Sequence, residues 1–301
     1  MQSVQLSIII VNYNTRDLTY HCITSLKEKT QGLSYEIIVI DNASQDQSIE
    51  FLQQQFPDVT IYASNENLGF GRANNIGAEL AKGEILLLLN SDTIIIDNSI
   101  KTLYDHLTTH PNTAVCGGLL LNADGSVGFS ADRQLSLTNY FRAFIPFLRS
   151  IPFEPNSTSV SEVDYIVGAD MMVKKEIFFK AGKFDPDFFL YCEETELCYR
   201  IRKLNYNIQL VPSAKIIHLE GKSSEGNQFV AFEKWYSRFL YFKKVYTPLH
   251  PYYLYGLYSA QCLIAFIRNA FNTSRKNIWY TRYYNMRGGF RKYKKQHPLF
   301  G

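Results

Sequence analysis

Residues 6–14 read LSIIIVNYN, a short run rich in Ile and Val that ends in polar side chains. Two further runs have the same character, EIIVI at residues 36–40 and ILLLL at residues 85–89. Such runs, without strict alternation of apolar and polar residues, are typical of parallel strands covered by helices on both faces. The three runs therefore predict an α/β fold with a mostly parallel central sheet.

Helix-like stretches separate these strands, at residues 17–29, 45–55 and 71–82. This β-α-β-α order predicts an open sheet flanked by helices, and such sheets bind ligands beyond the carboxyl ends of their strands. Polar residues stand at those ends: Asn12, Tyr13, Asn14, Asp41, Asn42, Asn90, Ser91 and Asp92. We therefore expect three polar clusters to meet at one edge of the sheet.

The turn after the first strand, VNYNTRD at residues 11–17, lacks both common phosphate-binding loops. It has neither the G-x-G-x-x-G of dinucleotide-binding folds nor the G-x-x-x-x-G-K-[ST] of a P-loop. A nucleotide bound here would need side chains and a metal ion to hold its phosphates. A nucleotidyltransferase that activates sugars is also disfavoured, because it would need a glycine-rich loop at this place.

The composition describes a folded globular protein, with 46% hydrophobic and 20% charged side chains among 301 residues. The five cysteines are odd in number and form no C-x-x-C pair, which argues against a disulfide framework and a structural zinc site. Residues 1–6 lead directly into a strand and show no signal-peptide pattern. These features favour a cytoplasmic protein.

Charge divides the chain into two parts. Residues 234–301 hold 13 Lys and Arg, no Asp or Glu, and 19 of the 44 aromatic residues. Residues 1–233 hold the other 18 basic side chains and all 28 acidic ones. This contrast predicts a catalytic domain at residues 1–233 and a helical, basic, aromatic-rich extension at residues 234–301.

Seven segments in order show a family resemblance: SIIIVNYN (7–14), VIDNAS (39–44), NENLGFGRANNIG (65–77), LLLLNSDT (86–93), VGADMMVKKEIF (167–178), FDPDFFLYCEETELCYR (184–200) and KIIHLEGKSS (215–224). Together they resemble family 2 glycosyltransferases with the GT-A fold, and most closely the bacterial rhamnosyltransferase-like branch. The resemblance spans about residues 5–245. It implies an inverting enzyme that uses a nucleotide-diphosphate sugar.

The resemblance implies that Tyr13 and Asp41 hold the base of the nucleotide. An aromatic ring can stack on a base, and a carboxylate can accept a hydrogen bond from a ring N–H. Arg72 would contact the base or the phosphates. Further nucleotide contacts are expected from Asn12, Asn14, Asn67 and Asn90. The alternatives are that Asp41 is a turn residue before an N-cap at Ser44, and that Arg72 is a solvated surface residue.

A metal site is implied by LLLLNSDT, where the family usually has D-x-D. Asn90 replaces the first Asp, so Asp92 is the only carboxylate left to hold Mn²⁺ or Mg²⁺. His218 matches a family position that contacts the metal or the diphosphate, and we expect it after a strand at residues 207–211 and a short connection. The alternatives are that Asp92 caps the next helix and that His218 is a packed residue.

Glu194 aligns with the family's catalytic base, the second residue of an E-D-x-D pattern. Here Glu replaces that Asp, so the carboxylate reaches about one methylene further. Glu193 and Glu196 are expected to orient the acceptor or a loop, or else to complement the dipole of the helix that starts there. Gly168, Ala169 and Asp170 should border the donor sugar, unless Asp170 only solvates a strand end. Residues 124–162 suggest a variable loop on the acceptor side.

The extension contains a segment, residues 245–267, without Asp, Glu, Lys or Arg. Its length approaches the ~20 residues of a membrane span. Two prolines and four tyrosines instead favour an interfacial helix: Pro248, Pro251, Tyr252, Tyr253, Tyr255 and Tyr258. Basic residues flank it: Lys243, Lys244, Arg268, Arg275, Lys276, Arg291, Lys292, Lys294 and Lys295. The alternatives are simple packing of the tyrosines and, disfavoured by the acidic body, binding to nucleic acid.

These patterns together predict an inverting, metal-dependent glycosyltransferase. The expected donor is dTDP-rhamnose or a UDP-sugar, and the expected acceptor is a glycan or a polyprenyl-diphosphate-linked glycan of a surface polysaccharide such as O-antigen or capsule. The enzyme would lie in the cytoplasm, peripheral at the inner face of the plasma membrane. The alternative is a degenerate family member that binds nucleotide-sugar or lipid-linked glycan without turnover.

Overall fold

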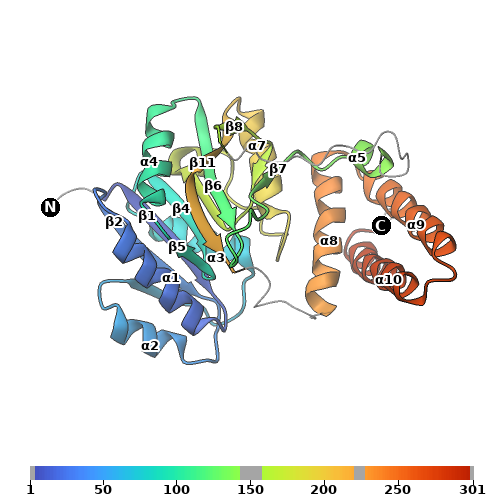
Figure 1. The fold of residues 1–301 in the computed structure, drawn as a ribbon, viewed down its shortest axis with the longest axis horizontal. Helices are drawn as coiled ribbons and strands as arrows, with labels where there is room; N and C mark the ends of the chain where they lie inside the picture. The colour runs from blue at the N-terminus through green and yellow to red at the C-terminus, as the bar shows by residue number, and fades with distance from the viewer. Residues whose placement is uncertain (1–3, 143–157, 220–227, 299–301) are drawn as a thin grey trace. The chain divides into compact units, whose positions relative to one another are not determined.

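The computed structural model describes residues 4–142, 158–219 and 228–298, and these form two compact units. The first unit holds residues 4–133, 158–189 and 193–219, and the second holds residues 134–142, 190–192 and 228–298. The first unit is the α/β part of the chain and the second is helical (Figure 1).

The first unit is built on one large sheet in the order β3-β2-β1-β4-β10-β6-β11-β5, with β8 also paired to β11. Its strands are β1 (Leu6–Asn12), β2 (Tyr35–Asp41), β3 (Thr60–Ala63), β4 (Ile85–Asn90), β5 (Thr93–Ile95), β6 (Thr113–Leu121), β8 (Ser161–Glu162), β10 (Asp170–Lys174) and β11 (Asn207–His218). β1 to β4 are parallel, as are β6 and β11, while β10 runs antiparallel between β4 and β6. The predicted mostly parallel sheet is confirmed. A small second sheet pairs β7 (Ala131–Asp132) with β9 (Tyr165–Ile166).

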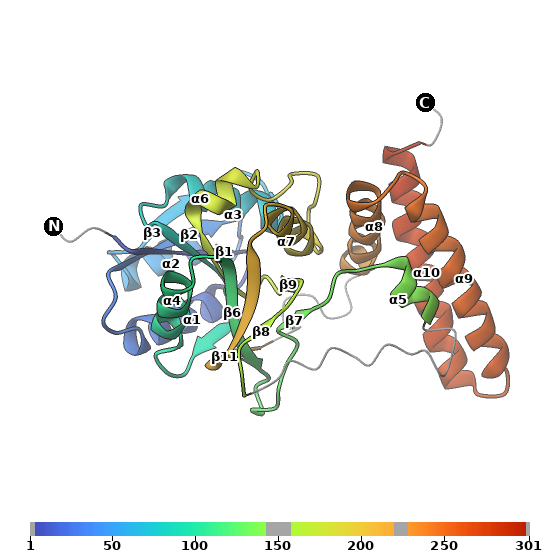
Figure 2. The same cartoon turned by 90° about the horizontal axis from the view of Figure 1, so that it is seen from above.

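Helices cover both faces of the sheet (Figure 2). They are α1 (Arg16–Lys29), α2 (Ser48–Gln55) and α4 (Ser99–Thr109) on one face, and α3 (Phe70–Leu80), α6 (Lys175–Lys180) and α7 (Glu193–Lys203) on the other. Ile8 and Ile10 of β1 join the core cluster that includes Cys22 of α1, whereas Ile9 faces Gly77 of α3. Both faces of β1 are therefore buried, which explains why its apolar run does not alternate.

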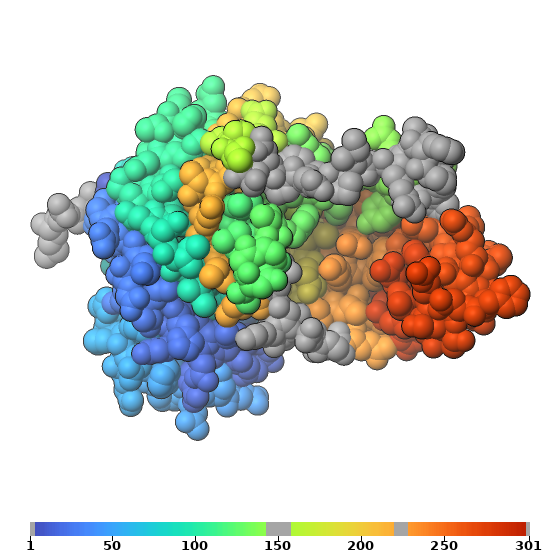
Figure 3. Space-filling model, viewed as in Figure 1, coloured from blue at the N-terminus to red at the C-terminus, as the bar shows by residue number. Residues whose placement is uncertain are grey.

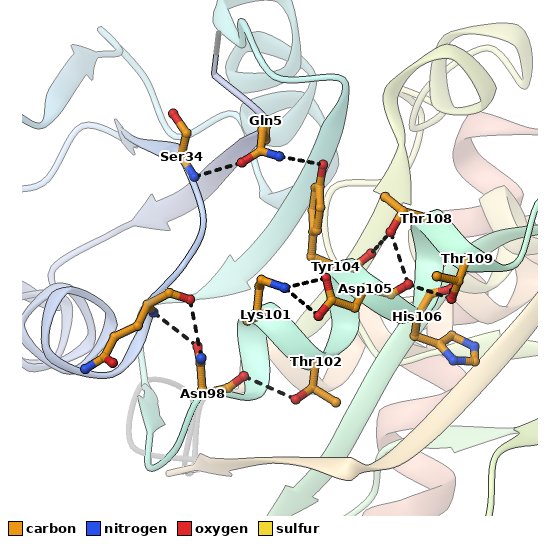
Figure 4. Close-up of polar contacts among 11 residues, drawn as sticks. Gln5, Ser34, Asn98, Lys101, Thr102, Tyr104, Asp105, His106, Thr108 and Thr109 are labelled. Carbon is orange, nitrogen blue, oxygen red and sulfur yellow. Dashed lines mark hydrogen bonds and ion pairs between the residues drawn. The ribbon is translucent and has the colours of Figure 1, made fainter. Parts of the chain in front are cut away.

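Polar contacts fix α4 to the amino ends of β1 and β2 (Figure 4). The Gln5 side chain accepts a hydrogen bond from the Ser34 N–H at 3.0 Å and contacts the Tyr104 hydroxyl at 3.4 Å. Asn98, which precedes α4, exchanges two hydrogen bonds with the backbone of Gln31. These contacts lie at the amino edge of the sheet, so they stabilise the fold from the side opposite the carboxyl ends.

β11 is longer than the sequence predicted. We expected a strand at residues 207–211 and then a connection, but the strand continues to His218. A register shift between Val211 and Lys215 interrupts the pairing with β6, and the pairing then resumes through Ile217. The irregular stretch is thus a bulge within one strand.

Of the loop predicted at residues 124–162, residues 143–157 lie outside the described residues.

The second unit consists of α5 (Leu137–Arg142), α8 (Gln228–Val245), α9 (His250–Arg268) and α10 (Thr273–Gln296). Aromatic rings pack its helices together. Trp235 and Tyr258 have ring centroids 4.4 Å apart, Phe239 and Phe290 are 5.0 Å apart, and Tyr255 stacks on Phe290 at 4.1 Å. Part of the tyrosine-rich segment therefore packs inside the unit.

No helix within the described ranges is long and apolar enough to cross a membrane.

The predicted domain boundary between residues 233 and 234 lies inside α8. Glu233 is 1% exposed, and its carboxylate pairs with the Lys292 ammonium of α10. Lys292 also lies over the Tyr236 ring, with its nitrogen 4.6 Å from the centroid. The change of charge that suggested the boundary is therefore not a structural boundary, because Glu233 is the counter-ion of a basic residue in the same helical unit.

We predict that Gly77→Ala destabilises the first unit by about 1–3 kcal/mol. An added Cβ at Gly77 would lie 2.4 Å from the Ile9 Cγ2 atom, in a place where neither the helix nor the strand can move freely. Urea unfolding followed by circular dichroism measures the change. Leu80→Ala is the matched control, because Leu80 lies on the exposed side of the same helix. Equal stability of the two variants would contradict close packing of α3 on β1.

Candidate active site

The carboxyl ends of β1 and β2 are joined by a buried side-chain hydrogen bond. Asn12 and Asp41 are paired in register, and the Asn12 amide donates to the Asp41 Oδ2 atom at 2.7 Å. The other carboxylate oxygen of Asp41 accepts the Ser44 N–H at 2.9 Å. Asp41 is 1% exposed and already uses two of its roughly four acceptor positions. The Ser44 contact is the turn bond of the alternative interpretation, although α2 begins only at Ser48.

Asn12 and Asn14, both expected to contact the nucleotide, make hydrogen bonds within the protein, and of the two only Asn12 is buried. The Asn12 side-chain oxygen accepts the hydroxyls of Thr15 at 2.9 Å and Thr19 at 2.7 Å, and Asn12 is fully buried. The Asn14 side chain accepts the Gln45 N–H at 2.7 Å. Tyr13, between them, is 47% exposed. The turn therefore presents the Tyr13 ring to the solvent while its neighbours hold the backbone.

Asn42 connects the end of β2 to the start of α3, and the sequence placed it at the polar edge without a specific role. Its amide donates to the Asn67 side chain and to the Gly69 carbonyl, both at 3.1 Å, and its oxygen accepts the Leu68 N–H at 3.0 Å. Asn67 in turn accepts the Gly69 N–H at 2.9 Å. Asn67, a predicted nucleotide contact, thus shapes the loop that enters α3. The one available signal for Asn42 was its position directly after Asp41 at a strand end.

Asn90, Asp92 and His218 come together at the carboxyl edge, as the sequence led us to expect. The His218 Nε2 atom lies 3.2 Å from the Asp92 carboxylate and 3.3 Å from the Asn90 amide. Asp92 and His218 are 9% and 8% exposed. His218 ends β11 and is paired with Thr93 of β5, which brings it beside the turn that carries Asp92. Because Asp92 leads into a strand and Asn98 precedes α4, the helix-cap alternative for Asp92 is excluded.

The donors at this place fit a divalent cation that takes part of its coordination from a ligand. The 3.2 Å between the Asp92 oxygen and the His218 nitrogen is close to the spacing of neighbouring ligands in an octahedral shell of about 2.1 Å radius. Within the described part of the chain, no group of three or more His, Cys, Asp and Glu side chains could hold a metal ion. Mg²⁺ in particular is commonly bound through one or two carboxylates together with substrate phosphates and water.

Asp170 lies behind the site, at the start of β10, and is fully buried. Its Oδ2 atom accepts the Gly118 N–H at 2.6 Å, and its Oδ1 atom accepts no hydrogen bond from a described residue. Burial raises the pKa of Asp170 to about 7, although the Gly118 N–H and the field of His218 both lower it. Asp170 therefore does not solvate a strand end, and it reaches the site only from the interior.

The two residues before Asp170 connect β10 to the polar edge. The Ala169 carbonyl accepts the Asn90 N–H at 2.9 Å, and Ala169 is fully buried. An added Cβ at Gly168 would lie 3.1 Å from the Phe70 ring at the start of α3. The predicted sugar-bordering segment thus lies between Asn90 and α3, where a larger residue at position 168 would have to displace an aromatic ring.

α7 begins with three carboxylates that have different surroundings. Glu193 and Glu196 are buried, at 3% and 5% exposed, whereas Glu194 is partly exposed. Glu196 forms a two-point ion pair with Arg200, with distances of 2.7 and 2.6 Å. Arg200 also donates to the Lys183 carbonyl at 2.7 Å. Glu196 therefore orients the preceding loop, and Glu194 is the carboxylate of this group that an acceptor can approach.

α3 holds the segment that leads into α7. The Asn75 side chain makes two hydrogen bonds with the backbone of Phe184, at 2.9 and 3.0 Å. The Arg72 Nε atom donates to the Pro186 carbonyl at 2.7 Å, and the Phe70 N–H donates to the Phe189 carbonyl at 3.0 Å. Arg72, predicted to contact the nucleotide, thus uses its Nε–H donor to bind this segment. Asn75 was not selected from the sequence, because its partner is 109 residues away.

The start of α3 also requires a glycine. Gly69 has a φ of 77°, and an added Cβ would lie 2.1 Å from the Phe189 carbonyl oxygen. An added Cβ at Gly71 would lie 3.7 Å from the Cβ atom of Glu193. The start of α3 therefore leaves little room for a larger residue next to the start of α7.

The chain is similar to known glycosyltransferases. A sequence model described as glycosyl transferase family 2 matches residues 7–171. The low-salt glycan biosynthesis hexosyltransferase Agl10 of Haloferax volcanii is 31% identical over 220 residues, which are 71% of this chain and 66% of that protein. The N-acetylglucosaminyl-diphospho-decaprenol L-rhamnosyltransferase of Mycobacterium tuberculosis is 26% identical over 238 residues, 73% of this chain and 77% of that protein. The matched region thus spans about two thirds of the Haloferax protein.

A likeness of fold extends over almost the whole chain. The mannosyltransferase PcManGT from Pyrobaculum calidifontis, solved with GDP-Man and Mn²⁺, superimposes with a TM-score of 0.63 at 14% identity. The match covers 99% of this chain and 89% of that one. At this identity the likeness concerns the fold alone.

We predict that the buried Asp170 makes the fold less stable as the pH rises from about 4 to about 7. In this range the unfolded chain ionises the carboxyl, whose ordinary pKa is 3.8, while the folded protein keeps it neutral. The loss amounts to ~4 kcal/mol across the range. Asp170→Asn cannot ionise, so the wild type should lose stability relative to this variant as the pH increases. Native-state hydrogen exchange of amides in β6 and β10 measures both proteins, and an identical pH dependence would contradict a neutral buried carboxyl.

Proposed function

The chain belongs to glycosyl transferase family 2, as its seven sequence segments predicted, and from this we propose that it transfers a sugar from a nucleotide-diphosphate donor to a glycan acceptor. The observation that carries the proposal is the meeting of Asn90, Asp92 and His218 at the carboxyl edge of the sheet. This edge also holds Asp41 and the exposed ring of Tyr13. A GT-A fold binds its ligand at this edge, and the polar groups are of the types that a nucleotide diphosphate requires.

The nucleotide base would lie against Tyr13, whose exposed ring offers a stacking surface. Asp41 would accept a base N–H through an acceptor position that Asn12 and Ser44 leave open. Asn12, Asn14 and Asn67 would act indirectly, by holding the loops around the base. Arg72 keeps N–H donors beyond the one used by Pro186 and is exposed, so its remaining donors can meet a phosphate.

The diphosphate would lie at Asp92 and His218, which would hold Mn²⁺ or Mg²⁺ between them. A divalent cation there neutralises the negative charge that develops on the departing diphosphate. Asn90 offers a neutral amide where the family usually has a carboxylate, so the protein contributes one negative charge less. The Mn²⁺ present in the Pyrobaculum structure supports a metal of this kind.

Glu194 would act as the general base. Its carboxylate would take the proton of the acceptor hydroxyl while that oxygen attacks the anomeric carbon from the side opposite the diphosphate. A single displacement of this kind inverts the configuration of that carbon. Glu194 suits this role because it is partly exposed, whereas Glu193 and Glu196 are buried and Glu196 is paired with Arg200.

Two relatives support the donor and acceptor classes that the sequence predicted. A hexosyltransferase of glycan biosynthesis and a rhamnosyltransferase acting on a decaprenol-linked sugar are both similar to this chain. We therefore favour dTDP-rhamnose or a UDP-sugar as donor, and a polyprenyl-diphosphate-linked or free glycan of O-antigen or capsule as acceptor. The enzyme would then work in the cytoplasm, peripheral at the inner face of the plasma membrane.

A second function is favoured by one observation, the replacement of a carboxylate by Asn90. With Asp92 as the single carboxylate of this group, a protein that binds nucleotide-sugar or lipid-linked glycan without turnover is the competing candidate. Binding and transfer must therefore be measured separately.

Calorimetric titration of dTDP and UDP, with and without Mn²⁺, tests the binding site. We expect one nucleotide to bind in a metal-dependent way, and Asp92→Asn to weaken that binding by about ten-fold or more. Asp105→Asn is the control, because Asp105 lies on α4 and pairs with Lys101 at the surface. Binding that ignores the metal would contradict a cation at Asp92 and His218.

Glu194→Gln tests the chemistry. The amide keeps the size of the side chain but cannot accept the proton, so we expect transfer to fall by about 10²–10⁴-fold with donor affinity unchanged. The measurement is release of nucleotide diphosphate from the donor in the presence of acceptor. Glu79→Gln serves as control, because Glu79 pairs with Lys183 at the surface. Unchanged transfer would exclude Glu194 as base, and absence of transfer in the wild type, with normal binding, would favour the non-catalytic alternative.

A further inference from the structure

The hairpin formed by α9 and α10 carries a set of exposed apolar side chains around its turn. We call this set the hairpin apex: Leu263, Ile264, Ile267, Phe271, Ile278 and Tyr280. Each is at least 46% exposed, and Phe271, in the turn between the helices, is fully exposed. Soluble proteins rarely expose so many large apolar side chains together, and such patches mark interaction sites.

The apex is continuous along one side of α9. Leu263, Ile264, Ile267 and Phe271 follow one another at intervals of one, three and four residues, which places them on one helix face that runs into the turn. The ring contacts with α8 instead involve Tyr258, Phe290 and Tyr293, in the halves of α9 and α10 away from the turn, and Tyr284 at the middle of α10. Figures 1 and 2 both show the turn at the end of the hairpin that points away from α8.

An apolar cavity of about 430 Å³ opens between the same two helices. Its walls include Leu263, Phe266, Trp279, Tyr280 and Tyr283. The cavity thus adjoins the apex and shares Leu263 and Tyr280 with it. Its lining is suited to a hydrocarbon chain, because aromatic and aliphatic carbon forms most of the wall. Figure 3 shows one face of the second unit in orange and red.

Basic side chains surround this apolar surface. The Lys276 nitrogen lies 4.8 Å from the centre of the Phe266 ring, and the Arg282 guanidinium lies 4.8 Å from the Trp279 ring. Arg268 and Arg275 are exposed on either side of the turn. No acidic residue occurs from residue 234 to residue 301, so a partner with negative charge is complementary to this surface.

We propose that the hairpin apex docks on an anionic phospholipid bilayer, with Phe271 and its apolar neighbours in the headgroup region and one lipid chain in the cavity. Aromatic and aliphatic side chains ringed by Lys and Arg are the combination that binds an anionic membrane surface. A second copy of this chain fits less well, because its apex would bring the same basic residues into contact. The inference rests on the proposed function only in that the bilayer would carry the lipid-linked acceptor.

Flotation of the full-length protein with vesicles tests the docking. The vesicles contain phosphatidylcholine alone or phosphatidylcholine mixed with phosphatidylglycerol. We expect binding to the mixed vesicles, about ten-fold weaker or absent binding to phosphatidylcholine alone, and weakening by high salt. Phe271→Ser combined with Ile267→Ser should reduce binding by about ten-fold or more, as should Arg275→Gln combined with Lys276→Gln.

Phe129→Ser combined with Val127→Ser is the matched control. Both residues are about half exposed and apolar, but they lie in the first unit. This control should bind vesicles as the wild type does. Circular dichroism establishes that each variant folds, and Trp279 gives a second measurement that needs no disruptive change. The Trp fluorescence should shift to the blue and be quenched by brominated lipid in the wild type, and this response should be lost in Trp279→Phe.

The outcomes separate this inference from the sugar-transfer proposal. Loss of vesicle binding by the apex variants, with nucleotide binding in solution unchanged, supports the docking surface. Equal flotation of the apex and control variants overturns it, as does a wild type that ignores phosphatidylglycerol. A dimer that only the apex variants lose would assign the surface to a second copy, and would also overturn it. Failure of nucleotide binding alone concerns the catalytic unit and leaves the docking result intact.

Discussion

The hydrogen bond between the Asn12 amide and the Asp41 carboxylate is the contact on which the carboxyl edge of the sheet depends. It joins two neighbouring strands, and the remaining oxygens of both side chains hold the turns that follow, through Ser44, Thr15 and Thr19. Asn12, Asp41 and Thr19 are buried, and an unpaired polar atom in the interior costs about 1–3 kcal/mol. Because these hydrogen bonds hold the turns after β1 and β2, the Tyr13 ring can remain exposed to solvent.

Side-chain hydrogen bonds also hold the segment that leads to the candidate base, Glu194. Asn42 holds the loop before α3, and Asn75 on α3 holds the backbone of Phe184, in the segment that leads to α7. Glu196 and Arg200 secure that segment from the other side. The position of Glu194 is therefore set by contacts that begin at the nucleotide side of the sheet.

The two units divide the chemistry of the chain. The first carries nearly all the acidic side chains and the groups suited to a nucleotide diphosphate, whereas the second is basic and aromatic. Among the described residues of the second unit, Glu233 is acidic, and its buried carboxylate neutralises Lys292 of the same unit. The cationic groups near the turn, such as Arg275, are exposed instead. Charge is thus compensated in the interior and left uncompensated at the surface where a bilayer is proposed.

The sequence by itself determined the α/β class, the strands that begin the sheet and the residues that end them, because burial on both faces leaves a continuous apolar run. It also predicted that Asn90, Asp92 and His218 would meet, through the family resemblance. Only the tertiary structure decided that Asn12 is buried, that the exposed Asn14 side chain holds the backbone of Gln45, that Asp170 is buried and that β11 continues to His218. Each of these depends on a partner far along the chain, such as Asp41 for Asn12 or Gly118 for Asp170, and a local pattern records burial and period but not the identity of a distant partner.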